Sequence, residues 1–313
     1  QSSYNNLNEL TAIASGGAAK FEATTNKALK SATINSNPAT LNWTKNFAGN
    51  ATLSNGTNTV PVGATDGANN TVTNNYQVAV SGPSSSSQTH DANGNMTSDG
   101  TNSYAWDAQN RLIKITYPGS GNFSEILYDA NGLQGQVGET RASSLTSTKQ
   151  FVRSGMDICE ERDATSSVSK KFFALGQTIS ASNYFYTHDH LGSVREMTDG
   201  AGYPAACYEY SPYGRTTNSG SLDADFQYAS YYAHLPSGFL MTLYRAYSPA
   251  QGCWINRDPL MERGGTNLYH YANNSPMIYT DSTGLYGTGD FVSHYYFGGG
   301  KAVDLGAVGL GKK

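Results

Sequence analysis

Short runs of apolar and β-branched residues, separated by turn-forming residues, make up the first third of the chain. Residues 32–34, 51–53, 59–62 and 76–80 are runs of this kind, and their length and composition are typical of β-strands. Asn-Gly and Asp-Gly pairs lie between them and favour tight turns. The pattern predicts an all-β fold built from short strands, and composition strengthens that prediction.

Only 38% of the residues are hydrophobic and 14% charged, while 34 Gly and 22 Tyr are present. Tyr favours strands, whereas Gly adopts the positive φ angles that turns require. The net charge is −4 and Lys and Arg are not concentrated anywhere, so a nucleic-acid partner is not expected. No apolar run reaches the roughly 20 residues that a membrane-spanning helix needs.

The three cysteines, Cys159, Cys207 and Cys253, are far apart in the sequence and form no CxxC pair. An odd and sparse set argues against both a disulfide framework and a zinc site. We therefore expect free thiols, no metal and no cofactor.

The chain divides into five predicted segments. Residues 1–14 contain one repeat-like turn, residues 15–83 form a small β-sandwich-like module, and residues 84–89 form a Ser-rich linker. Residues 90–285 carry the repeats, and residues 286–313 form a C-terminal tail.

A short motif recurs through residues 90–285. Its copies are Trp106-Asp107-Ala108-Gln109-Asn110, Tyr128-Asp129-Ala130-Asn131-Gly132 and, in degenerate form, Tyr210-Ser211-Pro212-Tyr213-Gly214. Each consists of an aromatic residue, Asp or Ser, two variable residues, and Gly or Asn. The Asp side chain can accept hydrogen bonds from backbone N–H groups of the turn, and Gly or Asn supplies its left-handed residue. Successive hairpins of this kind are expected to build one long sheet.

These units resemble the YD repeats of Rhs proteins, teneurins and the C components of Tc toxins. The segment Asp189-His190-Leu191-Gly192-Ser193-Val194-Arg195 is similar to the D-H-L-G-S-x-R signature of that family. Arg257-Asp258-Pro259 and Asp281-Ser282-Thr283-Gly284-Leu285 resemble its terminal Rhs-associated core. The resemblance covers residues 90–285 and also the turn near Tyr4.

The resemblance implies a bacterial, secreted or cell-surface protein whose repeats spiral into a hollow β-shell. In that family the shell encloses a variable C-terminal polypeptide, often a toxin, and the core cuts the chain just before it. By resemblance, the cleaved bond here is Leu285–Tyr286. The expected partner is thus the chain's own C-terminal effector segment.

Asp258 and Asp281 are the candidate catalytic residues, because two adjacent carboxylates can divide the roles of proton holder and activator of water. Arg257 is expected to stabilise the ionised partner or the oxyanion. A bond held within the same chain needs only a single turnover. The sequence thus predicts an aspartyl autoprotease.

Two departures from the family pattern affect this prediction. Met261 stands where the first motif usually has Gly, and Ser282 replaces the usual Pro of the second. Met261 can obstruct a left-handed turn, whereas Ser282 restores a backbone N–H and loosens φ. The alternative is that Asp258 and Asp281 only cap turns in a decayed core.

Other candidate sites remain open at this point. His188 and His190 could share a metal ion, and Ser193 beside His190 and Asp189 suggests a nucleophile, although turn and packing roles are the simpler interpretation. Several tyrosines are expected to line the shell interior, with a carbohydrate platform as the alternative; these are Tyr208, Tyr210, Tyr213, Tyr231, Tyr232 and Tyr244.

These motifs leave two candidate functions. The first is a shell that encloses an effector and releases it from the chain by self-cleavage. The second is a non-enzymatic extracellular protein for adhesion or carbohydrate contact. Exposed strand edges at the ends of an open shell also predict self-association.

Overall fold

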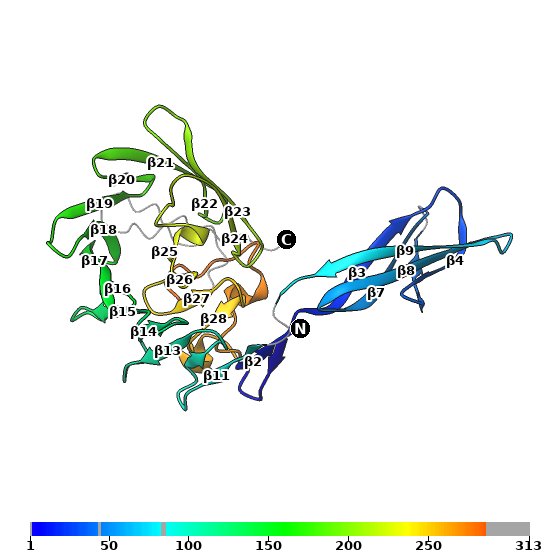
Figure 1. The fold of residues 1–313 in the computed structure, drawn as a ribbon, viewed down its shortest axis with the longest axis horizontal. Coiled ribbons are helices and arrows are strands. Elements are labelled where there is room, and N and C mark those ends of the chain that lie inside the picture. Colours follow the sequence, from blue (N-terminus) through cyan, green and yellow to red (C-terminus); the bar gives the residue numbers. More distant parts are fainter. Residues whose placement is uncertain (1, 43–44, 83–85, 286–313) are drawn as a thin grey trace, which may run out of the picture. The chain divides into compact units, whose positions relative to one another are not determined.

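The computed structural model describes residues 2–42, 45–82 and 86–285. It divides into two compact units, one made of residues 1–91 and 96–101 and the other of residues 92–95 and 102–313. Both consist of antiparallel strands joined by tight turns (Figure 1). The all-β prediction is therefore confirmed.

The first unit contains a two-sheet module and a smaller set of strands. One sheet of the module has the order β3-β7-β6 and the other β5-β4-β8-β9. Their bounds are β3 Gly16–Thr24, β4 Leu29–Ile34, β5 Asn37–Pro38, β6 Thr40–Leu41, β7 Asn46–Ser54, β8 Gly56–Asp66 and β9 Thr71–Val80. Ile34, Phe47 and Val60 are buried between the sheets. Side chains of a strand point alternately to its two faces. Each strand can therefore direct its apolar side chains into the space between the two sheets, where they form the core of the module.

Strands outside the module flank it in sequence. They are β1 Ser2–Tyr4, β2 Leu10–Ile13, β10 Ser86–Ser87, β11 Thr89–His90 and β12 Met96–Ser98. β2 pairs with both β1 and β10. Part of the predicted Ser-rich linker thus lies in a strand rather than in a free connection.

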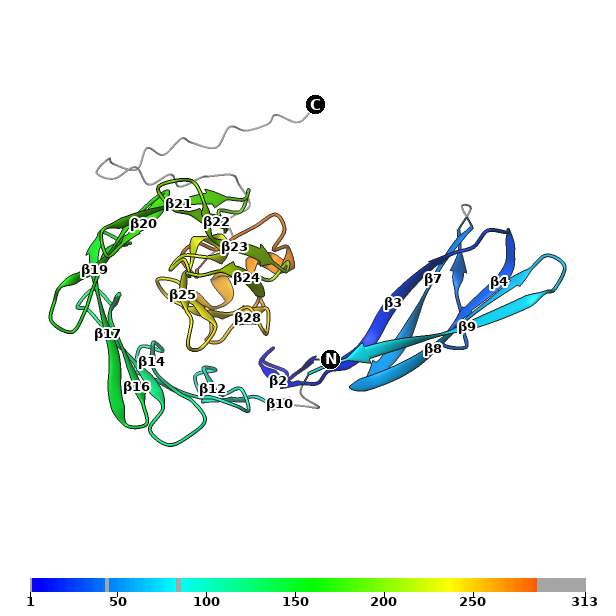
Figure 2. The same ribbon diagram turned by 45° about the horizontal axis from the view of Figure 1, so that its top comes forward.

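In the second unit, strands β13 to β24 pair in sequence order. They are β13 Ser103–Trp106, β14 Leu112–Thr116, β15 Phe123–Tyr128, β16 Gln134–Arg141, β17 Ser144–Ser154, β18 Asp157–Arg162, β19 Val168–Phe173, β20 Gly176–Ile179, β21 Ser182–His188, β22 Val194–Thr198, β23 Pro204–Tyr210 and β24 Thr216–Gly220. Figure 2 shows this sheet curling around the strands that follow. β24 ends the strand order and is exposed throughout; self-association through such an edge stays a prediction.

The enclosed part of this unit is a second, smaller sheet. It consists of β25 Tyr232–His234, β26 Phe239–Met241, β27 Ala246–Ser248 and β28 Cys253–Trp254, with the short 3-10 helices η1 Tyr228–Ser230, η2 Met261–Arg263 and η3 Ala272–Asn274 around it. Tyr247, Trp254 and Tyr271 are at most 1% exposed and pack against one another in tilted or edge-on pairs. Such pairs add about 0.5–1.5 kcal/mol each beyond burial of their area.

Polar contacts join the enclosed part of the unit to the curled sheet. His234 Nε2 lies 2.8 Å from Glu139 Oε1, and Lys170 Nζ lies 2.6 Å from Asp225 Oδ1. Phe151 packs edge-on against Tyr232 between these pairs. The carboxylates of Glu139 and Asp225 thus each have a partner, which offsets the cost of burying them.

A five-residue turn joins many of the strands; we call it the corner turn. At Asp129, the backbone N–H groups of Asn131 and Leu133 both donate to Asp129 Oδ1 at 2.9 Å, and Gly132 N–H donates to the Asp129 carbonyl. Gly132, the fourth residue, has φ +78°. The same pattern is formed at Asp107, Asp163, Asp189 and Asp199. This is the hydrogen bonding that the repeated motif predicts, with a left-handed residue in the fourth position.

Candidate functional site

Asp258 and Asp281 are almost completely buried, with exposed fractions of 6% and 1%. Asp258 follows β28 and precedes η2, whereas Asp281 follows η3. A carboxylate in such a position must be hydrogen-bonded or paired with a cation. The neighbours of both side chains therefore define what the site can do.

Each of these two aspartates begins a turn that is similar to the corner turn but has a different set of hydrogen bonds. Asp281 Oδ1 accepts hydrogen bonds from Gly284 N–H at 2.8 Å and Leu285 N–H at 2.9 Å. Asp258 Oδ1 accepts one from Leu260 N–H at 2.8 Å, and Met261 N–H donates to the Asp258 carbonyl at 3.0 Å. In both turns the backbone occupies Oδ1. Oδ2 remains for a partner from elsewhere.

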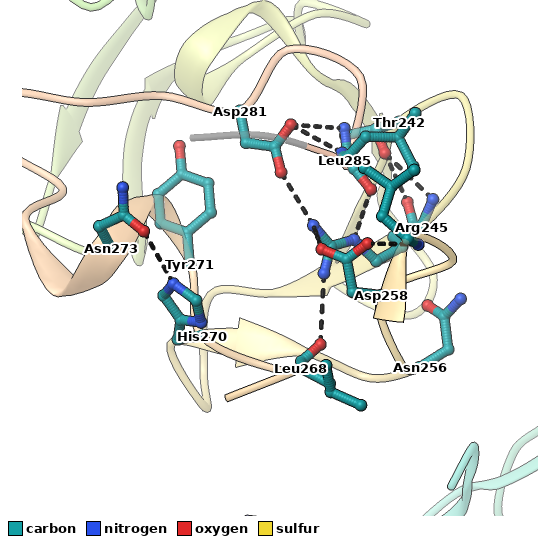
Figure 3. A network of polar contacts seen from close by, with 12 residues as sticks. Thr242, Arg245, Asn256, Asp258, Leu268, His270, Tyr271, Asn273, Asp281 and Leu285 are labelled. Carbon is teal, nitrogen blue, oxygen red and sulfur yellow. Dashed lines mark hydrogen bonds and ion pairs between the residues drawn. The ribbon is translucent and has the colours of Figure 1, made fainter. Parts of the chain in front are cut away.

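That partner is Arg245, which lies between β26 and β27. Figure 3 shows its side chain beside Asp258 and Asp281. Its Nη2 is 2.9 Å from Asp281 Oδ2 and 3.1 Å from Asp258 Oδ2. The structure therefore brings the two predicted aspartates together across one nitrogen atom. A planar guanidinium suits this task because its N–H groups point in fixed directions.

Arg245 also contacts an aromatic ring and a backbone carbonyl. Its guanidinium lies 4.3 Å from the centre of the Trp254 ring, and Nη1 donates to the Leu268 carbonyl at 3.3 Å. Burial lowers the pKa of Arg245 from its ordinary value, while Asp258 and Asp281 act in the opposite direction. An arginine stays protonated in proteins, so the three side chains carry one net negative charge when both carboxylates are ionised.

The same group fixes the chain just before the predicted cleavage point. Arg245 Nε donates to the Gly284 carbonyl, and Leu285 N–H is bound by Asp281. Tyr286 lies outside the described residues. The peptide unit between Gly284 and Leu285 is thus held at its carbonyl by Arg245 and at its N–H by Asp281.

Arg257, the arginine predicted at this site, has a different position. Its Cγ and Cδ atoms lie over Gly94, where an added Cβ would be 2.4 Å from Cδ. Within residues 86–285 it forms no ion pair or hydrogen bond with Asp258 or Asp281. Arg245, rather than Arg257, lies beside both carboxylates. The sequence did contain one signal: Arg245 is the only charged residue in the largely apolar run 239–247, and a buried charge requires a partner.

The two departures from the family pattern differ in their structural effects. Met261 adopts φ +54° at the fourth position of its turn, so the left-handed conformation is retained without glycine. An L-residue pays roughly 1–2 kcal/mol for this conformation. Ser282 is exposed. Neither residue prevents the two aspartates from meeting at Arg245.

The histidine motif forms a turn. Asp189 Oδ1 accepts hydrogen bonds from Leu191 and Ser193 N–H groups, while His190 Nε2 contacts the Met277 carbonyl at 3.1 Å. His188 packs edge-on against the Tyr186 ring. Among the described residues, no group of three or more His, Cys, Asp or Glu side chains could hold a metal ion.

The predicted tyrosine set contributes mainly to the core. Tyr208, Tyr231 and Tyr232 are at most 4% exposed, whereas Tyr244 is 43% exposed. Burial raises the pKa of Tyr208 to about 12. These positions favour the packing interpretation over a carbohydrate platform. Cys253 is also enclosed, and burial raises the pKa of its thiol to about 12; all three cysteines are free.

The fold is that of the β-shells of Tc toxins. A crystal structure of TcdB2-TccC3 superimposes on 91% of this chain and 16% of its own, with a TM-score of 0.53 and 15% sequence identity. The described residues contain no helix that is long and apolar enough to cross a membrane.

Curated relatives extend the comparison from fold to sequence. The tRNA3(Ser)-specific nuclease WapA of Bacillus spizizenii is 28% identical over 236 residues, 70% of this chain and 10% of its own. The probable deoxyribonuclease RhsA of Dickeya dadantii is 25% identical over 209 residues, 58% of this chain and 14% of its own. No family model matches the chain. The chain is therefore related to Rhs-type toxin proteins, and it spans only about a tenth to a seventh of the length of these relatives.

Proposed function

We propose that this chain is the end of an Rhs shell that encloses a C-terminal effector segment and cuts itself between Leu285 and Tyr286. The observation that carries the proposal is the buried group Asp258–Arg245–Asp281, which also holds the Gly284 carbonyl and the Leu285 N–H. Other relatives are named as toxins, among them the double-stranded DNA deaminase toxin A of Burkholderia cenocepacia and the toxin protein Tse5 of Pseudomonas aeruginosa, which supports a fused effector and a secreted or cell-surface location.

The proposed reaction is a hydrolysis with one water molecule. One aspartate takes a proton from the water molecule, and the water oxygen attacks the carbonyl carbon of Leu285. The other aspartate delivers a proton to the nitrogen of Tyr286, which leaves as an amine. Arg245 fixes both carboxylates and binds the carbonyl of Gly284, the residue before Leu285; in this proposal its positive charge stabilises the developing oxyanion. Burial strengthens this electrostatic effect, because the surrounding dielectric constant is low.

The experiment follows both cleavage and retention of the tail. The purified chain, carrying an epitope tag after Lys313, is run on a size-exclusion column under native conditions and then in denaturant. We expect the tag to elute with the shell in native buffer and to separate from it in denaturant. An Asp258→Asn variant should keep the tag attached in both conditions. Separation of the tag in native buffer would contradict enclosure.

A second candidate function is a shell without enzymatic activity. The observation that favours it is the ion pairing itself, because an arginine between two carboxylates also ties three distant segments of a core together. In this function, Asp258 and Asp281 would only hold the segment around Leu285 in place. A wild-type chain that keeps the tag in denaturant would select this function.

A further inference from the structure

Arg245 holds the side chain of Asp281, but a different residue holds its backbone. The Tyr231 hydroxyl donates to the Asp281 carbonyl at 2.7 Å and accepts from the Asp281 N–H at 3.1 Å. Both backbone groups of one residue are therefore bound by one oxygen atom. Tyr231 is separated from Asp281 by fifty residues of sequence.

The hydroxyl is in turn fixed by its surroundings. Tyr231 is 3% exposed, and its ring packs edge-on against the Tyr271 ring and tilted against the Trp254 ring. Its oxygen is 3.2 Å from the Tyr271 hydroxyl. Since the only proton of Tyr231 goes to the Asp281 carbonyl, Tyr271 must donate in this contact. Every hydrogen-bonding direction of the Tyr231 oxygen is thus occupied.

This hydroxyl stays protonated. Burial raises the pKa of Tyr231 far above its ordinary value, and the charge of Asp281 raises it further. A neutral phenol that both donates and accepts is suited to hold a peptide unit, whereas a phenolate would repel the carbonyl. The hydroxyl therefore keeps its proton across the physiological pH range.

We propose that Tyr231 is a positioning residue for self-cleavage: its hydroxyl sets the place of the Asp281 turn, and through it the place of Leu285. This inference rests on the proposed self-cleavage. The turn joins the two because Asp281 Oδ1 binds the Gly284 and Leu285 N–H groups. A displacement of about 1 Å at a reacting group can cost about a hundredfold in rate.

The test compares two single-hydroxyl deletions, Tyr231→Phe and Tyr247→Phe. Tyr247 belongs to the same aromatic core and is 0% exposed, but its hydroxyl donates to the Tyr213 carbonyl, away from the aspartates. Each variant keeps its ring, so the core keeps its packing. Self-cleavage is followed by pulse-labelled cell-free translation, in which precursor and product are separated on a denaturing gel across a range of pH.

We expect Tyr231→Phe to slow the first-order conversion by about 10- to 100-fold at every pH, and Tyr247→Phe to stay within about twofold of wild type. An equal slowing in both variants would overturn the inference, because it would indicate a general packing effect. A changed pH profile in Tyr231→Phe would also overturn it, because the hydroxyl would then transfer a proton rather than position a turn.

Hydrogen exchange of the 281–285 amides gives a second readout that does not depend on cleavage. It is measured on whole chains in the Asp258→Asn background. Loss of the Tyr231 hydroxyl should speed exchange at these amides about fivefold or more, since one or more hydrogen bonds are lost, while Tyr247→Phe should leave it unchanged. If wild type does not cleave at all, the proposed function fails, yet this exchange result still decides whether Tyr231 holds the turn.

Discussion

The turns at Asp129 and Asp281 are similar but lie in different environments. Asp129 Oδ1 accepts from the third and fifth residues of its turn, and Asp281 Oδ1 from the fourth and fifth. In both, the aspartate Oδ1 accepts two backbone N–H groups, and the fourth residue is a glycine with positive φ. Asp129 is exposed, whereas Asp281 is 1% exposed and its second oxygen meets Arg245. The turn positions the carboxylate in each case. Burial and the shared arginine, rather than the turn, distinguish the candidate site.

Asp107 is an intermediate case. It begins a corner turn, and its Oδ2 lies 2.6 Å from Arg111 Nη2. The pair is partly exposed, and the arginine comes from the same turn. An arginine beside a corner turn is therefore not enough to make a site of this kind. In the core, Arg245 is contributed by another hairpin and joins two turns.

The largest effect is expected when each arginine is removed. Arg245→Met leaves two buried carboxylates without their cation and should lower the free energy of unfolding by about 3–5 kcal/mol. Arg111→Met, at the partly exposed pair, should lower it by at most about 1 kcal/mol. Urea unfolding followed by tyrosine and tryptophan fluorescence measures both. Similar losses in the two variants would remove the distinction between the core and the shell turns.

The next effect concerns the aspartates themselves. Asp281→Asn removes a charge that faces Arg245 and should lower the free energy of unfolding by about 2–3 kcal/mol, because a charged hydrogen bond is lost in a buried place. Asp129→Asn keeps the turn's acceptor oxygen in an exposed place and should cost less than about 0.5 kcal/mol. Urea unfolding measures both variants. A larger loss of unfolding free energy in Asp129→Asn than in Asp281→Asn would contradict the comparison.

Substitutions at the fourth position of the two turns should change stability in opposite directions. Met261→Gly relieves an L-residue at φ +54° and should stabilise the chain by about 1 kcal/mol. Gly132→Ala places a side chain at φ +78° in otherwise uncrowded space and should destabilise it by about 1 kcal/mol. Thermal unfolding of the two variants beside wild type is the measurement. A destabilised Met261→Gly would show that the methionine side chain contributes more than its backbone costs.

The smallest effect is a dependence on pH at the shell turns. The pKa of Asp107 is below its ordinary value of 3.8, because hydrogen bonds and the charge of Arg111 outweigh burial, which acts in the opposite direction. Its stabilisation is therefore present above the unfolded pKa and is lost as the pH falls through the lower, folded pKa. Urea midpoints at pH 7 and pH 3 should differ less in Asp107→Asn than in wild type. An equal difference would contradict this linkage.

The fold was predictable where local chemistry determines it. The repeated Asp and the left-handed Gly or Asn specify the corner turn within five residues, so the all-β fold and its sequential hairpins could be predicted from motifs such as Tyr128–Gly132. Asp258 and Asp281 could be selected because they stand in similar short motifs.

The partners of these aspartates could not be predicted in the same way. Arg245 and Tyr231 come from other hairpins, and their contacts depend on how the enclosed sheet packs rather than on sequence spacing. Arg257, the neighbour of Asp258 in sequence, packs over Gly94 instead. Adjacent residues along an extended segment point to opposite sides, which is a physical reason to doubt any role assigned by adjacency alone.

The most direct test of self-cleavage is an intact-mass spectrum of the purified and denatured chain, recorded beside Asp258→Asn, Asp281→Asn and the shell control Asp129→Asn. We predict that wild type and Asp129→Asn give a product ending at Leu285, while the two core variants keep the full mass. A wild-type chain of full mass would contradict self-cleavage and leave the group around Arg245 with a structural role alone.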